Sequence, residues 1–447
     1  MAPRVVIVGG GISGLSAAYD LTRAGIDCTI FEKRPRAGGA IETQTFEDCR
    51  IDCGPDSFIS AKPEALELIR ELGIEDQLIG SNDDQRTTYI LKKGRLIPLP
   101  DGVMMMVPTK VMPMVRTPLL SWGTKLRMAR ELLRKPRTYP DRSVAEFVID
   151  HFGEETLDYL AEPLLSGVYG GDPRQLSAPS VLPRFVEMEQ RVGSLARAAM
   201  RSRQRGGSGS LFKTLKNGLG DLVDTLARQV RIEHREVEAI APGKVRAAGE
   251  WVEADHVILA VPAWEAARFL HEIDGKLAHL LREIPYSSSA TLTLIYEAAG
   301  FDGMRAGFGF LVPKRERERL AACTFVSTKF AFRAPASRIV LRCFFGGIDD
   351  AAALDESDES LVAIARDELR RILGLTAQPV HHTISRWPRS MAQYTVGHGP
   401  RVREIQARAA AIPGLHLAGN AYEGIGIPDC IRTGRTAARR IVDPEHR

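Results

Sequence analysis

The feature that most constrains this chain is its opening stretch, VVIVGGGISGLSAAYDLTRAGIDCTIFEK at residues 5–33. Four consecutive apolar residues, 5–8, predict a strand buried in a parallel sheet. Gly9, Gly11 and Gly14 follow and mark a tight turn into a helix. The chain therefore opens with the strand and the turn of a βαβ unit.

The rest of the stretch completes that unit. Leu15, Ala18 and Leu21 recur at helical spacing and give the helix an apolar stripe. A second apolar run at 28–31 predicts the next strand, and the acidic Glu32 follows it directly. Strand, glycines, helix, second strand and acid thus stand in the order of a dinucleotide-binding unit.

Each of these residues has a mechanical role in holding a dinucleotide. Gly9 permits the tight turn, Gly11 lets the backbone approach a pyrophosphate, and Gly14 lets helix and strand pack closely. The phosphates would meet the free N–H groups and the positive end of the helix dipole. Glu32 would accept hydrogen bonds from an adenosine ribose. We expect this unit to bind a dinucleotide.

The next residues, RPRAGGAIETQTF, favour one dinucleotide over another. Arg36, Gly38 and Gly39 form an R-x-G-G stretch just past the acid, where glycines let the chain lie flat against the nucleotide. This stretch resembles the second signature of the amine oxidase and protoporphyrinogen oxidase group of flavoproteins, and pyridine-nucleotide dehydrogenases usually lack it. It favours FAD over NAD.

Composition excludes several classes of protein. The 447 residues are 44% hydrophobic and 26% charged, as in a globular protein of two or three domains. No run of eighteen apolar residues predicts a membrane span. A net charge of +4 is too small to argue for nucleic acid as a partner.

The cysteines and histidines give no signature of a metal site. Cys49 and Cys53 lack a second pair that would complete a zinc site, and the histidines lack ligand spacing. Cys28 and Cys343 lie in strand-like runs, as buried small hydrophobic residues do. We expect no metal, and six scattered cysteines fit a reducing cytoplasm.

The order of predicted elements indicates an α/β fold with nested domains. The segments 1–80, 210–285 and 385–447 are expected to form a Rossmann-like FAD-binding domain of the GR2 type, assembled from discontinuous pieces. The segments 81–100 and 286–384 predict a mixed β-sheet substrate domain, and 101–209 a helical insertion. The Gly/Ser/Arg-rich stretch RSRQRGGSGSLFKTLKNG at 201–218 predicts a mobile loop.

The C-terminal segment GLHLAGNAYEGIGIPDCIRTGRTAA repeats the order of strand, glycines and helix found at residues 5–33. A short apolar strand is followed by Gly419, Gly424 and Gly426 and then by a helix that Pro428 can begin. A helix N-terminus aimed at a flavin ring would stabilise the negative charge of the reduced flavin.

With both termini in place, the chain resembles the protoporphyrinogen and coproporphyrinogen oxidase family, which makes haem precursors. Internal motifs in the family's order extend the resemblance over most of the chain: GPDSFISAKPEAL, EPLLSGVYGGDPRQLS, HVILAVPA and GFGFLVP. The resemblance implies the amine oxidase fold. It also implies oxidation of a porphyrinogen by six electrons and six protons, in three rounds of flavin reduction and reoxidation by O2, which gives H2O2.

The resemblance carries over a set of FAD-binding residues. It implies non-covalent FAD contacts at Gly9, Gly10, Gly11, Ile12, Ser13, Gly14, Glu32, Lys33, Gly39, Ala40, Gly54, Pro55, Asp56, Ser57, Val237, Trp387, Ile425, Gly426 and Ile427. The GPDS stretch departs from the pattern of the best-known animal relatives, which carry a second glycine and a basic residue there.

The resemblance also implies where the tetrapyrrole lies. Phe308, Gly309 and Leu311 match positions that sandwich a pyrrole ring, Phe344 lies on a neighbouring strand, and Val168 faces the macrocycle from the helical side. Large flat apolar ligands need such walls.

A propionate of the tetrapyrrole needs a cation, which the resemblance assigns to Arg86. Its planar guanidinium can pair with a carboxylate bidentately. Arg95 is the fallback, and Lys92 and Lys93 are further cations nearby. Because the flavin carries the chemistry, no catalytic acid, base or nucleophile is expected.

Two substrates and several activities remain open at this point. The apolar wall favours protoporphyrinogen IX over coproporphyrinogen III, which carries more propionates. An amine oxidase or a carotenoid desaturase would share both glycine motifs. A non-catalytic trafficking regulator on the same scaffold would lose the close-approach glycines, which are all present here.

A methionine-rich basic stretch at 103–135 has two interpretations. It could line the tetrapyrrole pocket, since methionine fills irregular gaps, or rest on an anionic lipid surface at the inner face of the membrane. The first is favoured. The protein is otherwise expected in the cytoplasm, as a monomer or homodimer, with other haem-pathway enzymes as candidate partners.

Overall fold

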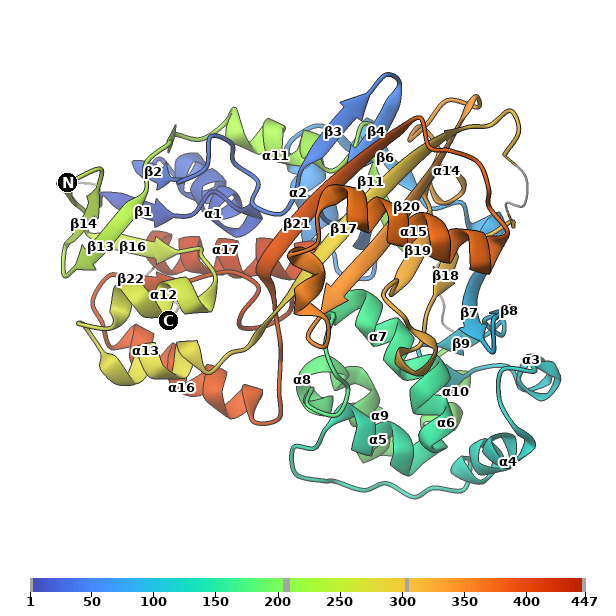
Figure 1. Ribbon diagram of the computed structural model, residues 1–447. Coiled ribbons are helices and arrows are strands. Elements are labelled where there is room, and N and C mark those ends of the chain that lie inside the picture. Colours follow the sequence, from blue (N-terminus) through green and yellow to red (C-terminus); the bar gives the residue numbers. More distant parts are fainter. Residues whose placement is uncertain (1–2, 204–209, 302–304, 444–447) are drawn as a thin grey trace. The chain divides into compact units, whose positions relative to one another are not determined.

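The computed structural model describes residues 3–203, 210–301 and 305–443, which form two compact units (Figure 1). The first unit contains Met1–Gly80, Leu211–Pro285 and Gly399–Arg447, and the second contains Ser81–Ser210 and Tyr286–His398. Residues 204–209 of the loop predicted at 201–218 lie outside the described residues, and the prediction is wrong for Phe212–Leu215, which form strand β11. The further division of the second unit into a β-sheet domain and a helical domain stays a prediction.

The first unit is built on a five-stranded sheet in which every neighbouring pair is parallel. Its strands in spatial order are β12 (Ile232–Glu233), β2 (Cys28–Phe31), β1 (Val5–Val8), β16 (His256–Leu259) and β22 (Leu415–Leu417). The chain enters this sheet in three separate segments. The predicted Rossmann-like fold with discontinuous pieces is therefore confirmed.

Three smaller sheets and seven helices complete the described part of the first unit. The small sheets pair β3 (Thr43–Phe46) with β4 (Cys49–Asp52), place β11 (Phe212–Leu215) between β5 (Phe58–Ile59) and β6 (Leu78–Gly80), and join β13 (Val237–Ala241), β14 (Lys244–Ala247) and β15 (Glu250–Glu253). The helices are α1 (Ile12–Arg23), α2 (Glu64–Glu71), α11 (Gly220–Ala227), α12 (Ala263–Leu270), α13 (Gly275–Arg282), α16 (His398–Ala410) and α17 (Ile427–Val442).

Helix α1 packs closely against both the first turn and helix α17. A Cβ at Gly14 would lie 2.0 Å from the Gly9 carbonyl oxygen, so Gly14 lets α1 approach the turn after β1. A Cβ at Gly434 would lie 2.1 Å from the Ser13 carbonyl oxygen, so a second glycine lets α17 reach α1. Gly14 and Gly434 therefore allow α1 to pack closely against the turn after β1 and against α17.

The second unit is built on a mixed seven-stranded sheet. Its strands in spatial order are β21 (His381–Ala392), β17 (Tyr286–Glu297), β20 (Arg338–Gly347), β19 (Ala322–Phe325), β18 (Gly309–Leu311), β7 (Thr88–Lys92) and β8 (Arg95–Pro98). Only β18 and β7 pair in parallel in this sheet. The predicted mixed sheet is confirmed, and β21 belongs to it although residues 385–447 were expected in the first unit.

One face of this sheet is filled by helix α15 (Asp358–Leu373), which lies across it in Figure 1. Leu361, Ala365 and Leu369 of that helix share a buried apolar core with residues such as Phe310 and Cys343 of the sheet. Because side chains alternate along a strand, the residues next to these two point to the opposite face.

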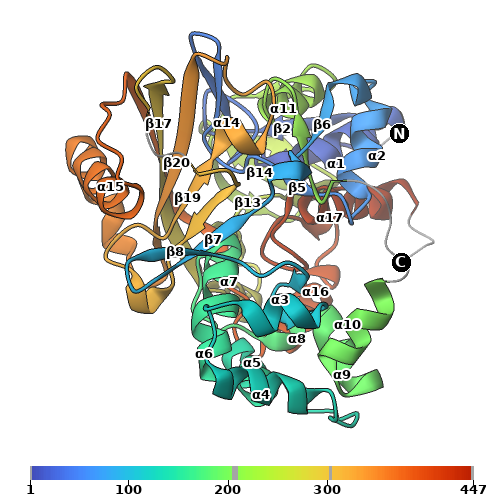
Figure 2. The same ribbon diagram turned by 90° about the vertical axis from the view of Figure 1, so that its right-hand side faces the viewer.

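The helical part of the second unit lies beside the sheet (Figure 2). It contains α3 (Val111–Arg116), α4 (Trp122–Glu131), α5 (Val144–Phe152), α6 (Glu154–Thr156), a π-helical segment (Leu157–Ala161), α7 (Glu162–Tyr169), α8 (Ala178–Val181), α9 (Pro183–Val192) and α10 (Leu195–Arg203). The remaining short elements are β9 (Val103–Met104), β10 (Val107–Pro108) and α14 (Val326–Lys329).

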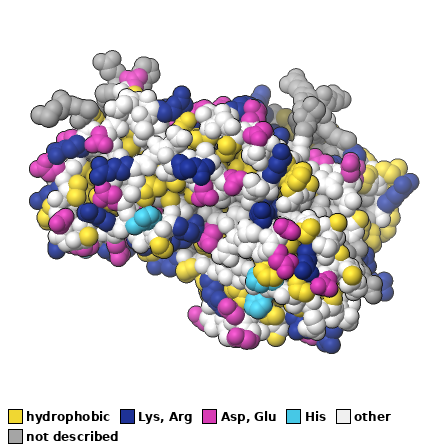
Figure 3. Space-filling view, turned by 90° about the horizontal axis from the view of Figure 1, so that it is seen from above, with side chains coloured by type: hydrophobic (Ala, Val, Ile, Leu, Met, Phe, Trp, Pro, Cys, Tyr) yellow, Lys and Arg dark blue, Asp and Glu magenta, His cyan; other side chains and the backbone are white. Residues whose placement is uncertain are grey.

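Three features of the structure can be compared directly with the sequence: a helix cap, the length and apolar character of the helices, and the distribution of surface charge. Ser143 and Glu146 form the reciprocal capping box at the start of α5 that their spacing suggests. None of the helices among the described residues has the length and apolar character needed to cross a bilayer. On the face shown in Figure 3, basic and acidic side chains are interspersed, as expected for a small net charge.

Candidate active site

The turn between β1 and α1 leaves an open cradle at Gly11. A Cβ at Gly9 would lie 2.6 Å from the Ala260 carbonyl oxygen, so the fold itself requires that glycine. A Cβ at Gly11 would meet nothing within 4 Å, although Gly11 is the N-cap of α1. The first turn of α1 carries no acidic side chain. This space and the free N–H groups at the helix start suit a pyrophosphate.

Glu32, the predicted ribose acceptor, is held by two backbone groups. Its buried carboxylate accepts hydrogen bonds from the backbone N–H groups of Gly10, at 2.7 Å, and Arg34, at 2.8 Å. These bonds use one acceptor position on each oxygen. An ionised carboxylate has about four such positions, so two remain for ribose hydroxyls.

The R-x-G-G loop lies directly over the first glycine motif. The Gly38 N–H donates to the Gly10 carbonyl oxygen at 2.7 Å, and a Cβ at Gly39 would lie 3.2 Å from the Gly11 Cα. Both Gly38 and Gly39 have positive φ, where an L side chain is strained. The structure therefore brings the two predicted signatures together.

Arg36 and Lys33 are engaged with protein groups. The Arg36 guanidinium donates to the carbonyl oxygens of Gly39, at 2.9 Å, and Ile41, at 3.1 Å, and pairs with Glu42 at 2.6 Å. Arg36 therefore shapes the loop. Lys33 pairs with Glu265 at 3.1 Å.

Two further cofactor contacts expected in the first unit are the GPDS stretch and Val237. A Cβ at Gly54 would lie 1.7 Å from the Ala40 carbonyl oxygen, so GPDS packs on the R-x-G-G loop. Within that stretch the Ser57 hydroxyl donates to Asp56 at 2.6 Å. Val237 is buried at the start of β13.

The start of α17 contains an ion pair that the sequence reasoning missed. Gly426 is the N-cap, and its N–H donates to the Asp429 carboxylate at 3.3 Å. The buried Asp429 also accepts from the Lys62 ammonium at 2.6 Å. The helix start expected near the flavin ring, Ile425–Ile427, thus includes a carboxylate balanced by a lysine. The sequence pattern that could have predicted this helix cap is the acidic residue three positions after Gly426, Asp429.

The predicted substrate residues Leu311 and Phe344 occupy one row of the second unit's sheet. Leu311 pairs with Ala322, which pairs with Phe344. Cross-strand partners point to the same face, and this is the face opposite α15. Gly309 lies two residues from Leu311 on the same face. These residues therefore form one half-buried wall.

Trp387 lies on this same face. Its partner on β17 is Ser289, two residues from Thr291, which pairs with Phe344. Trp387 was expected near the flavin ring, so one face of the sheet carries predicted flavin and substrate contacts.

Helix α7 approaches the wall from the helical part of the unit. A Cβ at Gly167 would lie 3.7 Å from the Leu311 Cδ2 atom. The next residue, Val168, is 49% exposed. The Phe308 N–H donates to the Thr87 carbonyl oxygen at 2.8 Å, which places Phe308 one residue from Arg86 in this ladder.

The cations proposed for propionate binding differ in availability. The Arg86 side chain is 68% exposed, and its guanidinium lies 3.7 Å from Asp101. Lys92 donates to the Leu119 carbonyl oxygen at 2.5 Å and pairs with Glu155 at 3.2 Å. Lys92 is therefore engaged with residues of the helical part, and we do not propose it as a propionate ligand.

A cluster in the helical part, in which His151 and Glu189 are buried and Asp150 is exposed, contains metal-ligand residue types. Ligand atoms of Asp150, His151 and Glu189 lie within 4.8 Å of one another. The two His151 ring nitrogens lie 3.0 Å from Glu131 and from Glu189, and Arg142 pairs with Glu189 at 2.5 Å. The Arg142 guanidinium offsets the charge of Glu189, and we interpret the cluster as structural.

Comparisons with known proteins agree with this geometry. The family model described as flavin containing amine oxidoreductase matches residues 12–442. A coproporphyrinogen III oxidase of Bacillus subtilis is 33% identical over 97% of this chain and 96% of its own length. The mitochondrial protoporphyrinogen oxidase of Nicotiana tabacum is 25% identical over 99% of this chain and 95% of its own.

A solved structure agrees over the full length. The crystal structure of a protein from Exiguobacterium, described as a putative protoporphyrinogen oxidase, has a TM-score of 0.89 and 32% identity, with all of both chains covered. Both glycine signatures and the start of α17 fit that match. The chain belongs to the flavin containing amine oxidoreductase family and, within it, to the protoporphyrinogen and coproporphyrinogen III oxidases.

Proposed function

We propose that this oxidoreductase converts a porphyrinogen to the porphyrin by six-electron oxidation in haem biosynthesis, with O2 as acceptor and H2O2 as the reduced product. The observation that carries the proposal is the match to a coproporphyrinogen III oxidase over 97% of the chain. Leu311, Phe344 and Trp387 on one face of the sheet support it, because a planar macrocycle needs apolar and aromatic contacts.

We propose FAD, held non-covalently, as the flavin. When bound, the flavin accepts hydride from the substrate and returns the electrons to O2. Gly11 and the start of α1 hold its pyrophosphate, and Glu32 holds its adenosine ribose. The Gly39–Ala40 and Gly54–Ser57 segments pack along the cofactor, and Ile425–Ile427 lies at the ring.

The second unit supplies the proposed tetrapyrrole site. Leu311 and Phe344 contact the macrocycle from the sheet, and Val168 from α7. Gly309 lets β18 pair closely with β19, because a Cβ there would lie 2.0 Å from the Cys323 carbonyl oxygen. Arg86, which is exposed at the edge of this wall, pairs with a propionate. No side chain is proposed as a catalytic base.

We propose coproporphyrinogen III as the preferred substrate. The apolar wall alone favoured protoporphyrinogen IX, but the chain is more similar to the Bacillus coproporphyrinogen III oxidase than to the tobacco enzyme, at 33% against 25% identity. The exposed Arg86 also suits a substrate with more carboxylates, since propionates that remain in water escape the cost of burial.

The test is the ratio of kcat/KM for the two porphyrinogens, followed by porphyrin fluorescence under air. We expect a preference for coproporphyrinogen III of at least about tenfold, or 1.4 kcal/mol. A preference for protoporphyrinogen IX would reverse the substrate assignment and leave the reaction type intact. Oxidation of neither, by a flavin-loaded protein, would refute the proposed function.

We propose, in addition, that the protein rests on anionic membrane lipid through helices α3 and α4. Large apolar side chains there are exposed: Val111, Met112, Val115, Trp122, Leu126 and Leu133. Residues 110–137 contain eight lysines and arginines and one acidic residue, Glu131, which is buried. Exposed apolar groups among basic ones suit an anionic lipid surface. This exposure argues against the pocket-lining role favoured for the stretch.

Tryptophan fluorescence offers a test with a matched control. Lys125 lies 4.6 Å above the exposed Trp122 ring, and Lys244 lies 4.7 Å above the exposed Trp251 ring. Vesicles of phosphatidylglycerol should shift the emission to the blue at low salt. Trp122→Phe should remove most of the shift, and Trp251→Phe should leave it. A shift that Trp251→Phe abolishes, or no binding, would contradict the proposed surface.

A further inference from the structure

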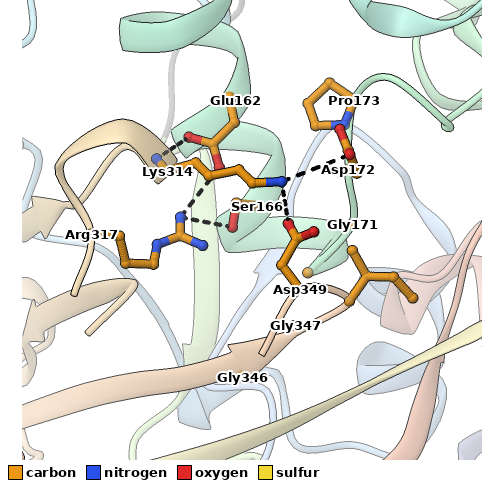
Figure 4. Close-up of a pocket in the computed structure, with 12 residues that line it drawn as sticks. Glu162, Ser166, Gly171, Asp172, Pro173, Lys314, Arg317, Gly346, Gly347 and Asp349 are labelled. Carbon is orange, nitrogen blue, oxygen red and sulfur yellow. Dashed lines mark hydrogen bonds and ion pairs between the residues drawn. The ribbon is translucent and has the colours of Figure 1, made fainter. Parts of the chain in front are cut away.

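A polar cluster joins helix α7 to the sheet on the side shown in Figure 4. Glu162 and Ser166 come from α7, and Lys314 and Arg317 come from the loop after β18 (Figure 4). Asp349 follows the end of β20. The cluster therefore connects three elements that are distant in the sequence.

Arg317 is the centre of this cluster. Its Nη2 donates to a Glu162 carboxylate oxygen at 3.2 Å and to the Ser166 hydroxyl at 3.3 Å. The same guanidinium donates to the Val312 carbonyl oxygen, at 2.9 Å from Nη2 and 3.3 Å from Nε. The side chains of Arg317 and Glu162 are 13% and 11% exposed. A single planar group thus bonds the helix and the strand end together.

Lys314 adds a second connection beside the first. Its N–H donates to the other Glu162 oxygen at 2.9 Å, and its ammonium pairs with Asp349 at 2.8 Å. Burial raises the pKa of Glu162, and Arg317 and Lys314 oppose that rise. Glu162 needs both partners, because a buried carboxylate without a cation is costly.

These bonds join the two elements that carry the walls of the proposed tetrapyrrole site. Val312 directly follows Leu311, and Ser166 comes two residues before Val168. Between them, the Cβ position of Gly167 is 3.7 Å from Leu311. Arg317 therefore joins the backbone behind one wall residue to the helical turn that carries the other.

The backbone on either side of α7 is irregular, so helical continuity alone does not hold it. The π-helical segment Leu157–Ala161 precedes it, and Gly170, in the left-handed conformation, follows it. π-helical turns shift the direction of the side chains that follow, and glycine caps end a helix. The cross-links from the sheet therefore add to what holds α7 in place, together with the bonds that the Tyr169 carbonyl oxygen accepts from Ser287 and Gln393.

We propose that Arg317, through its ion pair with Glu162, is a positioning residue that sets the separation between Val168 and Leu311, and hence the affinity for the porphyrinogen. This inference rests on the proposed function, and it names the residue that sets the affinity of the proposed tetrapyrrole site for its substrate. Because Arg317 acts on the walls and not on the reacting carbon, its loss should weaken substrate binding more than it slows chemistry.

The experiment compares Arg317→Met and Arg317→Lys with the flavin-loaded wild type, with coproporphyrinogen III and protoporphyrinogen IX as substrates. Arg317→Met should raise KM by about tenfold and change kcat by less than about threefold, with flavin content unchanged. Arg317→Lys should recover part of the KM, because an ammonium reaches Glu162 but cannot span Glu162 and Val312 together.

Arg315→Met is the matched control. Arg315 lies on the same loop and pairs with Asp158 at 2.8 Å, but its side chain is 54% exposed and bonds neither Glu162 nor Ser166. Its removal should leave KM unchanged. If Arg317→Met moves KM no further than Arg315→Met does, or lowers kcat alone, the inference is wrong.

A second variant covers the case in which Arg317→Met does not fold. Glu162→Gln keeps the shape and one acceptor but removes the charge, and it should raise KM in the same direction by a smaller factor. An unchanged KM in a folded Glu162→Gln protein would also overturn the inference. A wild type that oxidises neither substrate would instead refute the proposed function, which separates the two failures.

Discussion

Gly11→Val should give a folded protein that no longer retains its flavin. A Cβ at Gly11 meets no protein atom within 4 Å, so valine disturbs only what lies in front of the helix start. A pyrophosphate approaches the backbone at this position too closely for a side chain. The Kd for FAD, measured by flavin fluorescence, should rise by at least about tenfold, or 1.4 kcal/mol.

Gly275→Val is the control for this substitution. Gly275 begins α13 in the same unit, and a Cβ there also meets nothing within 4 Å. It should keep full flavin content. Gly14→Val should instead fail to fold, because its Cβ would lie 2.0 Å from the Gly9 carbonyl oxygen. Normal flavin content in Gly11→Val would show that the pyrophosphate site lies elsewhere.

Glu131→Ala should cause a large loss of stability. Its fully buried carboxylate accepts from Ser194 Oγ at 2.8 Å and from the Leu195 N–H at 2.6 Å, and it lies 3.0 Å from His151 Nδ1. Removing one partner of such a buried network costs about 3–5 kcal/mol. Urea unfolding at pH 7 should show this fall in the free energy of unfolding, against total stabilities of about 5–15 kcal/mol.

The pH dependence of the free energy of unfolding should show that the Glu131 carboxylate stabilises the fold in its ionised form. Burial alone would raise the pKa of Glu131, but hydrogen bonds involving His151, Ser194 and Leu195 lower it overall, below the usual 4.5. A carboxyl with a lowered folded pKa stabilises the fold above its unfolded pKa and loses that contribution as the pH falls through the folded value. The difference between wild type and Glu131→Ala should therefore shrink below pH 4.5.

Glu187→Ala serves as the comparison for Glu131. Glu187 forms an i,i+4 pair with Arg191 at 2.9 Å, and its side chain is 61% exposed. Exposed pairs contribute about 0–1 kcal/mol, so the substitution should be nearly neutral. Equal losses in Glu131→Ala and Glu187→Ala would contradict the assignment of a buried network.

The sequence by itself determined the elements whose signals are local. Strand 5–8, the glycine turn and the helix after it follow from the spacing of neighbouring residues, as does the capping box at Ser143. The same holds for the order of motifs at both ends of the chain, which placed it in its family. These features were predictable because hydrophobic periodicity and turn chemistry act over a few residues.

Only the tertiary structure decided which distant side chains meet. Asp429 pairs with Lys62 across 367 residues, and Arg317 bonds Glu162 across 155. Lys92, a candidate propionate ligand by sequence, is turned to Glu155 instead. Nothing in the local pattern of these charged residues distinguishes one partner from another. Their pairing depends on which elements pack together and on the cost of leaving a buried charge unpaired, and both are properties of the folded chain.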